Sequence, residues 1–180
     1  MQYIDVSHRT LPAVTRPRTY FRSMIVLHTS GGYNSLGWLM GGSVKSGKPV
    51  SSDFLVNRRG DIYQITRPYW YAYHTGAAYF RGRQEPDKTL NQQAVGVEIE
   101  CHEGHGQVIT NLQYISTAAL VARLMGYHAI TVEDVTTHAV IALPPGRKVD
   151  PQYLDWHNFT REWESPSVEV GQLLFPAVLP

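Results

Sequence analysis

Three residues of the kinds that bind zinc lie far apart in the chain, each where an apolar run or a loop ends. His28 follows the apolar run 24–27, and His138 and Asp150 bracket a loop rich in proline and glycine. A catalytic zinc site uses three His, Asp, Glu or Cys ligands and leaves a fourth position for water. Two histidines and a carboxylate also bind non-heme iron, and single histidines are often ordinary hydrogen-bonded polar residues. Together the three residues predict a metal site without fixing its ion.

Two further groups could act on a substrate held at that site. Glu98 and Glu100 alternate with apolar residues in the run 97–100, so in a strand both acids face the same side. That face must meet solvent, a cation or a site, because burying bare carboxylates is costly. The alternative for Glu98 is an exposed strand glutamate. Lys148 could direct its ammonium at a developing oxyanion, or it is a solvated loop lysine.

These motifs resemble those of the type 2 N-acetylmuramoyl-L-alanine amidases. That family includes the amidase-type phage lysozymes and shares its fold with the peptidoglycan recognition proteins. The resemblance rests on the strand ending at His28, on segment 96–100, and on His138 followed by the block 145–151. It covers about residues 20–165 of one domain.

The resemblance implies a role for each of these residues. The zinc ligands would be His28, His138 and Asp150. Glu98 would be the general base that passes a proton from water to the leaving amine, and the family match supports Lys148 beside the oxyanion. His74, in the aromatic-His-x-Gly segment 73–76, would lie beside the cleft, where it contacts substrate or only packs.

Other residues allow two interpretations. Trp70 could stack on a sugar face, although aromatic residues this dense are more often core, and Arg147 could face substrate or support its loop. The run 100–105, Glu-Cys-His-Glu-Gly-His, could be a second metal motif, but strand alternation points its first two residues to opposite faces. One departure from the family is Ser-Asp at 52–53, where many relatives carry Tyr-His or a small residue and His. A carbonyl-polarising role for that tyrosine must lie elsewhere or be absent.

Composition predicts a soluble globular protein and argues against several classes. The 180 residues are 43% hydrophobic and 17% charged with a net charge of +1, so no strong field favours nucleic acid or anionic lipid. The single cysteine, Cys101, cannot form an intramolecular disulfide. We see no signal peptide and no apolar run of about 18 residues. We therefore expect no membrane insertion, synthesis in the host cytoplasm, and access to the cell wall through another factor.

The order of apolar runs and turn signals predicts a single α/β domain, with a central mixed sheet flanked by helices, as the catalytic unit over residues 1–180. Strands are expected over 22–29 and 95–101, with a hairpin over 51–65, and segment 132–136 leads into the loop that carries the predicted metal ligands. Helices are expected over 34–44, 111–127 and 151–163, the second beginning in a capping box. Residues 1–21 should form an arm with little regular structure, 77–93 an exposed loop, and 166–180 a tail.

We expect a monomeric zinc amidase that cuts the bond between N-acetylmuramic acid and L-alanine in peptidoglycan. The identity of the bond rests on the resemblance, and a phage endolysin is the favoured context. The alternatives are a cytoplasmic muropeptide-recycling amidase and a non-catalytic peptidoglycan-binding module of the same fold.

Overall fold

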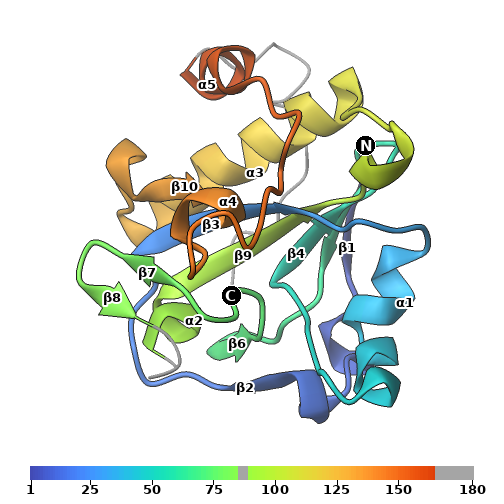
Figure 1. Ribbon diagram of the computed structural model, residues 1–180, viewed down its shortest axis with the longest axis vertical. Helices are drawn as coiled ribbons and strands as arrows, with labels where there is room; N and C mark the ends of the chain where they lie inside the picture. The colour runs from blue at the N-terminus through green and yellow to red at the C-terminus, as the bar shows by residue number, and fades with distance from the viewer. Residues whose placement is uncertain (85–88, 165–180) are drawn as a thin grey trace.

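A mixed β-sheet runs through the middle of the molecule (Figure 1). The computed structural model describes residues 1–84 and 89–164. The strand order in the sheet is β1-β5-β4-β9-β3-β10. These strands are β1 (Tyr3–Asp5), β5 (Ile62–Gln64), β4 (Phe54–Val56), β9 (Ala94–Ile99), β3 (Met24–Thr29) and β10 (Val135–Thr137). β4 and β5 pair antiparallel, which confirms the predicted hairpin, and β9 is parallel to both β4 and β3.

Helices cover both faces of this sheet. α3 (Asn111–His128) and α5 (Trp156–Glu164) lie on one face, and α1 (Ser35–Leu39) and α2 (Thr89–Gln93) lie on the other (Figure 1). The short helix α4 (His138–Ile141) follows β10. Two small ribbons pair β2 (Thr15–Pro17) with β6 (Trp70–Ala72) and β7 (Tyr79–Phe80) with β8 (Arg83–Gln84). Single 3-10 turns are η1 (Ser7–Arg9), η2 (Pro12–Val14), η3 (Gly42–Ser46), η4 (Glu103–His105) and η5 (Val132–Asp134).

Alternation along β3 decides which face carries the polar residue at its end. Ile25 and Leu27 are buried in the core beneath α3, whereas Met24 and Val26 are buried in the cluster on the opposite face. Full burial of each such side chain stabilises the fold by roughly 1.5–3 kcal/mol. Because side chains alternate, His28 emerges on the face opposite α3.

The predicted capping box at the start of α3 is confirmed. Thr110 accepts a hydrogen bond from the Gln113 backbone amide, and the Gln113 side chain accepts one from the Thr110 amide. This reciprocal pair satisfies two amides that a helix N-terminus leaves without intrahelical partners.

The N-terminal arm is more regular than predicted. Residues 3–5 form an edge strand parallel to β5, and residues 15–17 pair with β6. Both pairings join segments more than fifty residues apart, so local turn residues gave no signal of them. The expectation of little regular structure over 1–21 was wrong.

The helix predicted over 34–44 is interrupted. α1 ends at Leu39, and a separate 3-10 turn starts at Gly42. Gly41 has φ of 142°, and a Cβ there would lie 2.5 Å from a Leu11 carbon. Asn34 makes no side-chain cap and has a left-handed φ of 58°. A close approach of the N-terminal arm therefore ends this helix.

The last helix also starts later than predicted. α5 begins at Trp156 rather than at 151, and Pro151 lies in the turn before it, after a cis peptide bond. The exposed loop expected over 77–93 contains β7, β8 and α2, while its residues 85–88 and the tail 166–180 lie outside the described residues. None of the described helices combines the length and apolarity needed to cross a membrane.

Candidate metal centre and active site

Three of the predicted site residues lie along one row across the sheet. β3 and β9 pair in parallel with His28 opposite Glu98. β3 and β10 pair in parallel with Leu27 opposite Thr137, so the next residue on β10's side is His138. Neighbouring strands lie about 4.8 Å apart. The sheet register therefore brings together residues that are up to 110 positions apart in sequence.

His138 is the first residue of α4, and Asp150 lies at the end of the loop that follows this helix. The backbone amide of Ala139 donates to the Asp150 carbonyl at 2.9 Å. This contact ties the third predicted ligand to the first turn of the helix that carries the second.

The ligand atoms of these residues converge on one point. His28 Nδ1 lies 3.0 Å from His138 Nδ1, and Asp150 Oδ2 lies 3.0 Å from His138 Nδ1 and 3.6 Å from His28 Nδ1. All three atoms lie within 4.8 Å of one another, and this is the one His/Cys/Asp/Glu group of metal-binding geometry among the described residues. The structure thus brings together the predicted His28, His138 and Asp150.

The hydrogen bonds around the cluster favour a cation at that point. His138 Nε2 lies 3.0 Å from the Thr75 carbonyl oxygen, which can only accept, so Nε2 carries the proton and a neutral His138 presents a lone pair at Nδ1. That lone pair faces the Asp150 carboxylate oxygen at 3.0 Å. Two acceptors at this distance repel unless a positive charge lies between them. Two imidazoles and a carboxylate match the ligands that zinc takes, so the residues fit the metal.

Burial and mutual contact shift the pKa values in this cluster. Burial lowers the pKa of His28 to about 4, against the opposing attraction of the Asp150 carboxylate. Burial alone would raise the pKa of Asp150, but its close contacts with the His138 and His28 rings hold it well below its usual range. Near neutral pH the cluster therefore offers a neutral His28 imidazole and an ionised carboxylate, which are the protonation states that bind metal.

Glu98 is the unusual acid of the site. It is half-buried, and its Oε2 has no hydrogen-bond partner in the structure. Burial raises the pKa of Glu98 to about 8, the negative charge of Asp150 adds to the shift, and Lys148 opposes it. A carboxyl that changes protonation state near neutral pH beside a metal cluster has the property of a general acid or base.

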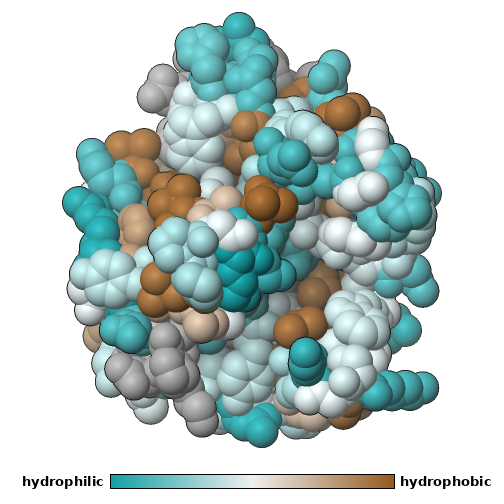
Figure 2. Space-filling model, in the orientation of Figure 1, coloured by the Kyte–Doolittle hydropathy of each residue, from teal (hydrophilic) through white to brown (hydrophobic). Residues whose placement is uncertain are grey.

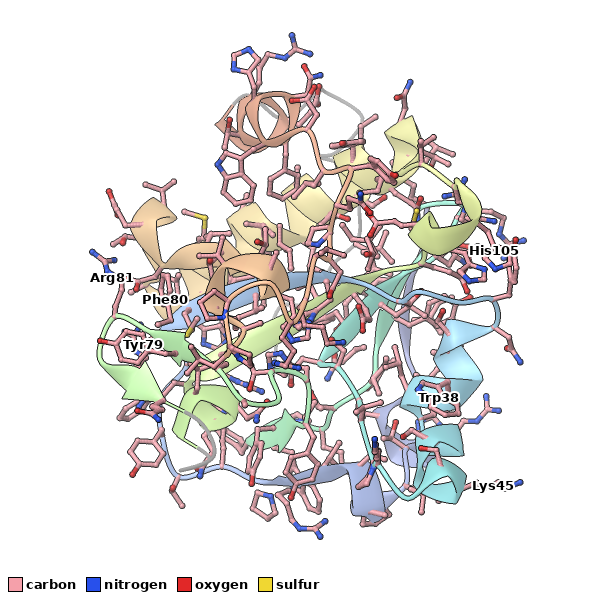
Figure 3. All side chains as sticks on the ribbon, viewed as in Figure 1. Trp38, Lys45, Tyr79, Phe80, Arg81 and His105 are labelled. Atoms are coloured by element: carbon pink, nitrogen blue, oxygen red, sulfur yellow. The ribbon has the colours of Figure 1, made fainter. Side chains whose placement is uncertain are left out.

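A cavity of about 480 Å³ opens over the cluster, with His28, His138, Asp150, Glu98 and Lys148 in its wall. Figure 2 shows this side of the molecule hollowed near its middle, with hydrophilic and hydrophobic side chains mixed around the depression. The opposite wall includes two exposed aromatic residues of the β3–α1 region, Tyr33 and Trp38, and Trp38 is labelled on α1 in Figure 3. Sequence reasoning missed both, because nothing in their local pattern separates them from ordinary surface aromatics.

The three predicted substrate contacts fall in different places. His74 Nδ1 lies 2.9 Å from His28 Nε2, and the ring packs against Gly96, where a Cβ would lie 2.8 Å away. His74 is thus placed to orient a ligand. Arg147 donates to the backbone carbonyls of Leu143 and Ala77 at 2.7 Å each. It therefore holds its loop against the segment beside His138.

Trp70 lies in β6, opposite Pro17, with the Arg67 guanidinium 5.6 Å from its ring centre. It is not among the described residues that line the cavity over the cluster. This placement does not support a stacking contact between Trp70 and a substrate there.

The run 100–105 does not assemble a metal site in the described part of the chain. The Cys101 side chain is buried with Sγ 3.4 Å from the Gln107 carbonyl oxygen, and the His102 and His105 rings stack at 3.9 Å. The Glu103 carboxylate instead reaches other segments of the protein, as described below.

Asp53, the departure from the family pattern, belongs to a buried ion pair. Its carboxylate lies 2.6 Å from the Arg22 guanidinium and accepts from the Thr66 hydroxyl and the Gly96 amide. The segment 52–53 therefore supports β9 from below and contributes no group to the cavity.

Comparison with known proteins agrees with this geometry. The family model described as N-acetylmuramoyl-L-alanine amidase matches residues 18–153. A curated relative, the 1,6-anhydro-N-acetylmuramyl-L-alanine amidase AmpD of Enterobacter cloacae, is 30% identical over 111 residues. That match covers 61% of this chain and 55% of the relative, so the chain spans about half of the relative's length.

Solved structures share the fold at low sequence identity. A selenomethionine AmpD derivative has a TM-score of 0.70 at 23% identity, covering 89% of this chain and 93% of that one. AmiD of E. coli, in complex with anhydro-N-acetylmuramic acid-L-Ala-D-gamma-Glu-L-Lys, has a TM-score of 0.65 at 23% identity. The match covers 82% of this chain and 60% of the AmiD chain. The endolysin amidase LysCS of Clostridium intestinale URNW has a TM-score of 0.67 at 18% identity. The match covers 91% of this chain and 95% of the LysCS chain. With the family model matching most of its length, the chain belongs to the N-acetylmuramoyl-L-alanine amidase family.

Proposed function

We propose that this protein hydrolyses the amide between the lactyl group of N-acetylmuramic acid and L-alanine in peptidoglycan, with zinc held by His28, His138 and Asp150. The observation that carries the proposal is the convergence of three metal-binding atoms beside the half-buried carboxyl of Glu98. Zinc in such a ligand set makes water nucleophilic near neutral pH and polarises a carbonyl group.

Glu98 handles the proton in the proposed reaction. The attacking water loses a proton to the Glu98 carboxylate, and the same carboxyl gives it to the alanine nitrogen as the carbon–nitrogen bond breaks. The products are the free carboxylic acid of the lactyl group and the free amine of the peptide. A pKa of about 8 keeps both protonation states accessible near neutral pH.

The remaining residues orient and balance charge. Lys148, exposed in the cavity wall, is placed to offset the negative charge that develops on the carbonyl oxygen, a stabilisation of roughly 3 kcal/mol for a preorganised donor. The His138 tautomer is set by the Thr75 carbonyl, and His74 contacts the far nitrogen of His28. Such contacts orient a metal ligand and raise its basicity.

Two forms of substrate have support. The predicted endolysin context requires cutting of intact walls, and the similarity to the endolysin amidase LysCS supports it only at the level of fold. The curated relative, named for 1,6-anhydromuramyl peptides, shares more sequence and favours small wall fragments as in recycling. The proposed bond is the same in both. Relative kcat/KM on purified walls and on anhydromuramyl peptides separates the two contexts.

Mass spectrometry of the products tests the proposed bond. Digestion of purified peptidoglycan should release peptides with a free L-alanine amine and glycan with intact disaccharides. A chelator should stop the release, zinc should restore it, and Asp150→Ala should abolish it. Binding to walls without any release of peptide would instead support the binding module, and release that ignores both chelator and Asp150→Ala would remove the metal from the reaction.

A further inference from the structure

The Glu103 carboxylate joins the two chain segments that carry metal ligands. Its Oε2 accepts a hydrogen bond from the Thr29 hydroxyl at 2.6 Å, and Thr29 directly follows His28. Its Oε1 accepts from the backbone amides of Gln152 and Tyr153 at 2.9 and 3.2 Å. One buried side chain thus contacts the end of β3 and the turn just after Asp150.

The surroundings suit a carboxylate in this position. Glu103 is only 9% exposed, whereas His105 on the same turn is exposed at the outer edge of the molecule (Figure 3). The turn therefore directs its acid inward and its second histidine outward. The Glu103 carboxylate is the acceptor in all three hydrogen bonds, so the ionised acid is satisfied without a metal. Bonds to an ionised acceptor are roughly twice as strong as neutral ones.

Asp150 needs such support because it lies on a loop rather than in the sheet. His28 is fixed by β3 and His138 by the first turn of α4. Asp150 itself is held by the bond from the Ala139 amide to its backbone carbonyl, and the chain that follows it is next held at Gln152 by Glu103. Without that second hold, the Asp150 carboxylate could swing away from the two imidazoles.

We propose that Glu103 is a positioning residue of the metal centre, which clamps the Asp150 turn to the strand end at His28. The inference rests on the proposed zinc site, but it concerns how tightly that site holds its ion rather than which bond is cut. Partners that orient metal ligands typically contribute about 10–100-fold to metal affinity. Glu103 acts one residue removed from the ligands, so we expect the lower end of that range.

Zinc affinity of the folded protein, measured by competition with a chromophoric chelator, tests the proposal. Glu103→Ala should weaken zinc binding about tenfold. Glu103→Gln should recover most of the loss, because the amide oxygen still accepts from both backbone amides and the Thr29 hydroxyl can accept from the amide nitrogen. A general loss of packing would not be rescued in this way.

Glu100→Ala is the matched control. Glu100 lies three positions earlier on the same connection, and its carboxylate oxygens contact the backbone amides of Ser35 and Arg58 at 3.4 Å each, away from the ligands. Its zinc affinity should stay at the wild-type value. Equal weakening in Glu100→Ala and Glu103→Ala, or wild-type affinity in Glu103→Ala, would overturn the proposal.

A variant that removes a single contact covers the case in which Glu103→Ala fails to fold. Thr29→Val deletes only the hydroxyl that donates to Glu103, and zinc affinity should fall by about two- to fivefold. Unchanged affinity in Thr29→Val would contradict the clamp. If the wild-type protein itself binds no zinc, the proposed function fails instead, so the two failures are distinguishable.

Discussion

Two clusters of buried and half-buried polar side chains lie against β9 and differ in how they are completed. In the first, the Asp53 carboxylate accepts from Arg22, Thr66 and the Gly96 amide, while the Arg22 guanidinium also donates to the Trp70 and Ala94 carbonyls. Each charge meets groups of the opposite kind within the protein. The Arg22–Asp53 pair is therefore a complete unit.

In the second cluster, the groups that meet are of the same kind. The Asp150 carboxylate faces the lone pair of His138, and Glu98 Oε2 has no hydrogen-bond partner in the structure. Unsatisfied buried polar groups are unfavourable, which supports the proposal that this cluster binds an ion and a substrate. The comparison teaches that a buried polar cluster indicates a site when its own chain cannot satisfy it.

The largest effect is expected from His138→Ala, which disrupts the second cluster and leaves the Arg22–Asp53 pair intact. His138→Ala should remove stoichiometric zinc and with it nearly all amidase activity, because two remaining ligands bind zinc weakly. The metal-free variant should still unfold cooperatively, since the core beneath α3 is untouched. Elemental analysis together with urea unfolding measures both properties. Zinc retained at one ion per chain would contradict the assignment.

Glu98→Gln should separate chemistry from metal binding. The amide keeps the shape of the acid but cannot take the proton from water, so kcat should fall by roughly 10²–10⁴-fold while zinc stays bound. Steady-state rates and zinc content on the same preparation provide the measurement. A rate within a few-fold of wild type would remove Glu98 from the mechanism.

Asp53→Ala should have the opposite profile to His138→Ala. It leaves the Arg22 guanidinium buried without its partner, which typically costs about 3–5 kcal/mol of the free energy of unfolding. Urea unfolding in chelator should show this loss. The double variant Asp53→Leu with Arg22→Met is the control and should be more stable than Asp53→Ala, because no charge is left unpaired. If the double variant is equally unstable, the loss comes from packing rather than from the stranded charge.

A smaller effect concerns pH. Because the folded, metal-free protein raises the pKa of Glu98 from its usual value of 4.5 to about 8, ionisation of this acid favours the unfolded chain as pH rises between those values. Glu98→Gln should therefore be more stable than wild type above pH 8. The full change in pKa would correspond to about 5 kcal/mol, and solvent screening of a half-buried carboxyl should reduce this to about 1–2 kcal/mol. The two proteins should be equally stable near pH 4. Thermal unfolding of both proteins in chelator across this pH range gives the comparison. A stability difference that grows toward acid pH would contradict the prediction.

The smallest effect is expected at Cys101. Cys101→Ser should leave zinc content and turnover unchanged, because the thiol donates to the Gln107 carbonyl and lies outside the metal cluster. Loss of zinc in this variant would revive the run 100–105 as a metal site.

Sequence alone could predict features that depend on local pattern. The apolar strand before His28, the alternating run around Glu98 and the Thr110–Gln113 capping box each follow from a few neighbouring residues. The convergence of the predicted metal ligands rested on their residue types and on the resemblance to a family. No local pattern shows which strands are neighbours.

The features that sequence analysis missed depend on distant contacts. β1 becomes regular only through pairing with β5, and α1 ends where Leu11 packs against Gly41. The role of Glu103 was hidden because its partners lie about 50 and 74 positions away. In each case the deciding neighbour is brought close by the fold and not by the sequence.

The register that aligns Glu98, His28 and His138 across three parallel strands has a thermal consequence. The spacing of a hydrogen-bonded sheet hardly changes until the whole domain melts, so base and imidazoles should stay aligned up to the melting temperature. Among the three proposed ligands, Asp150 alone is carried by a connecting segment, so heating should release it first. Inactivation at temperatures below the unfolding transition should then be reversible on cooling, and excess metal should slow it.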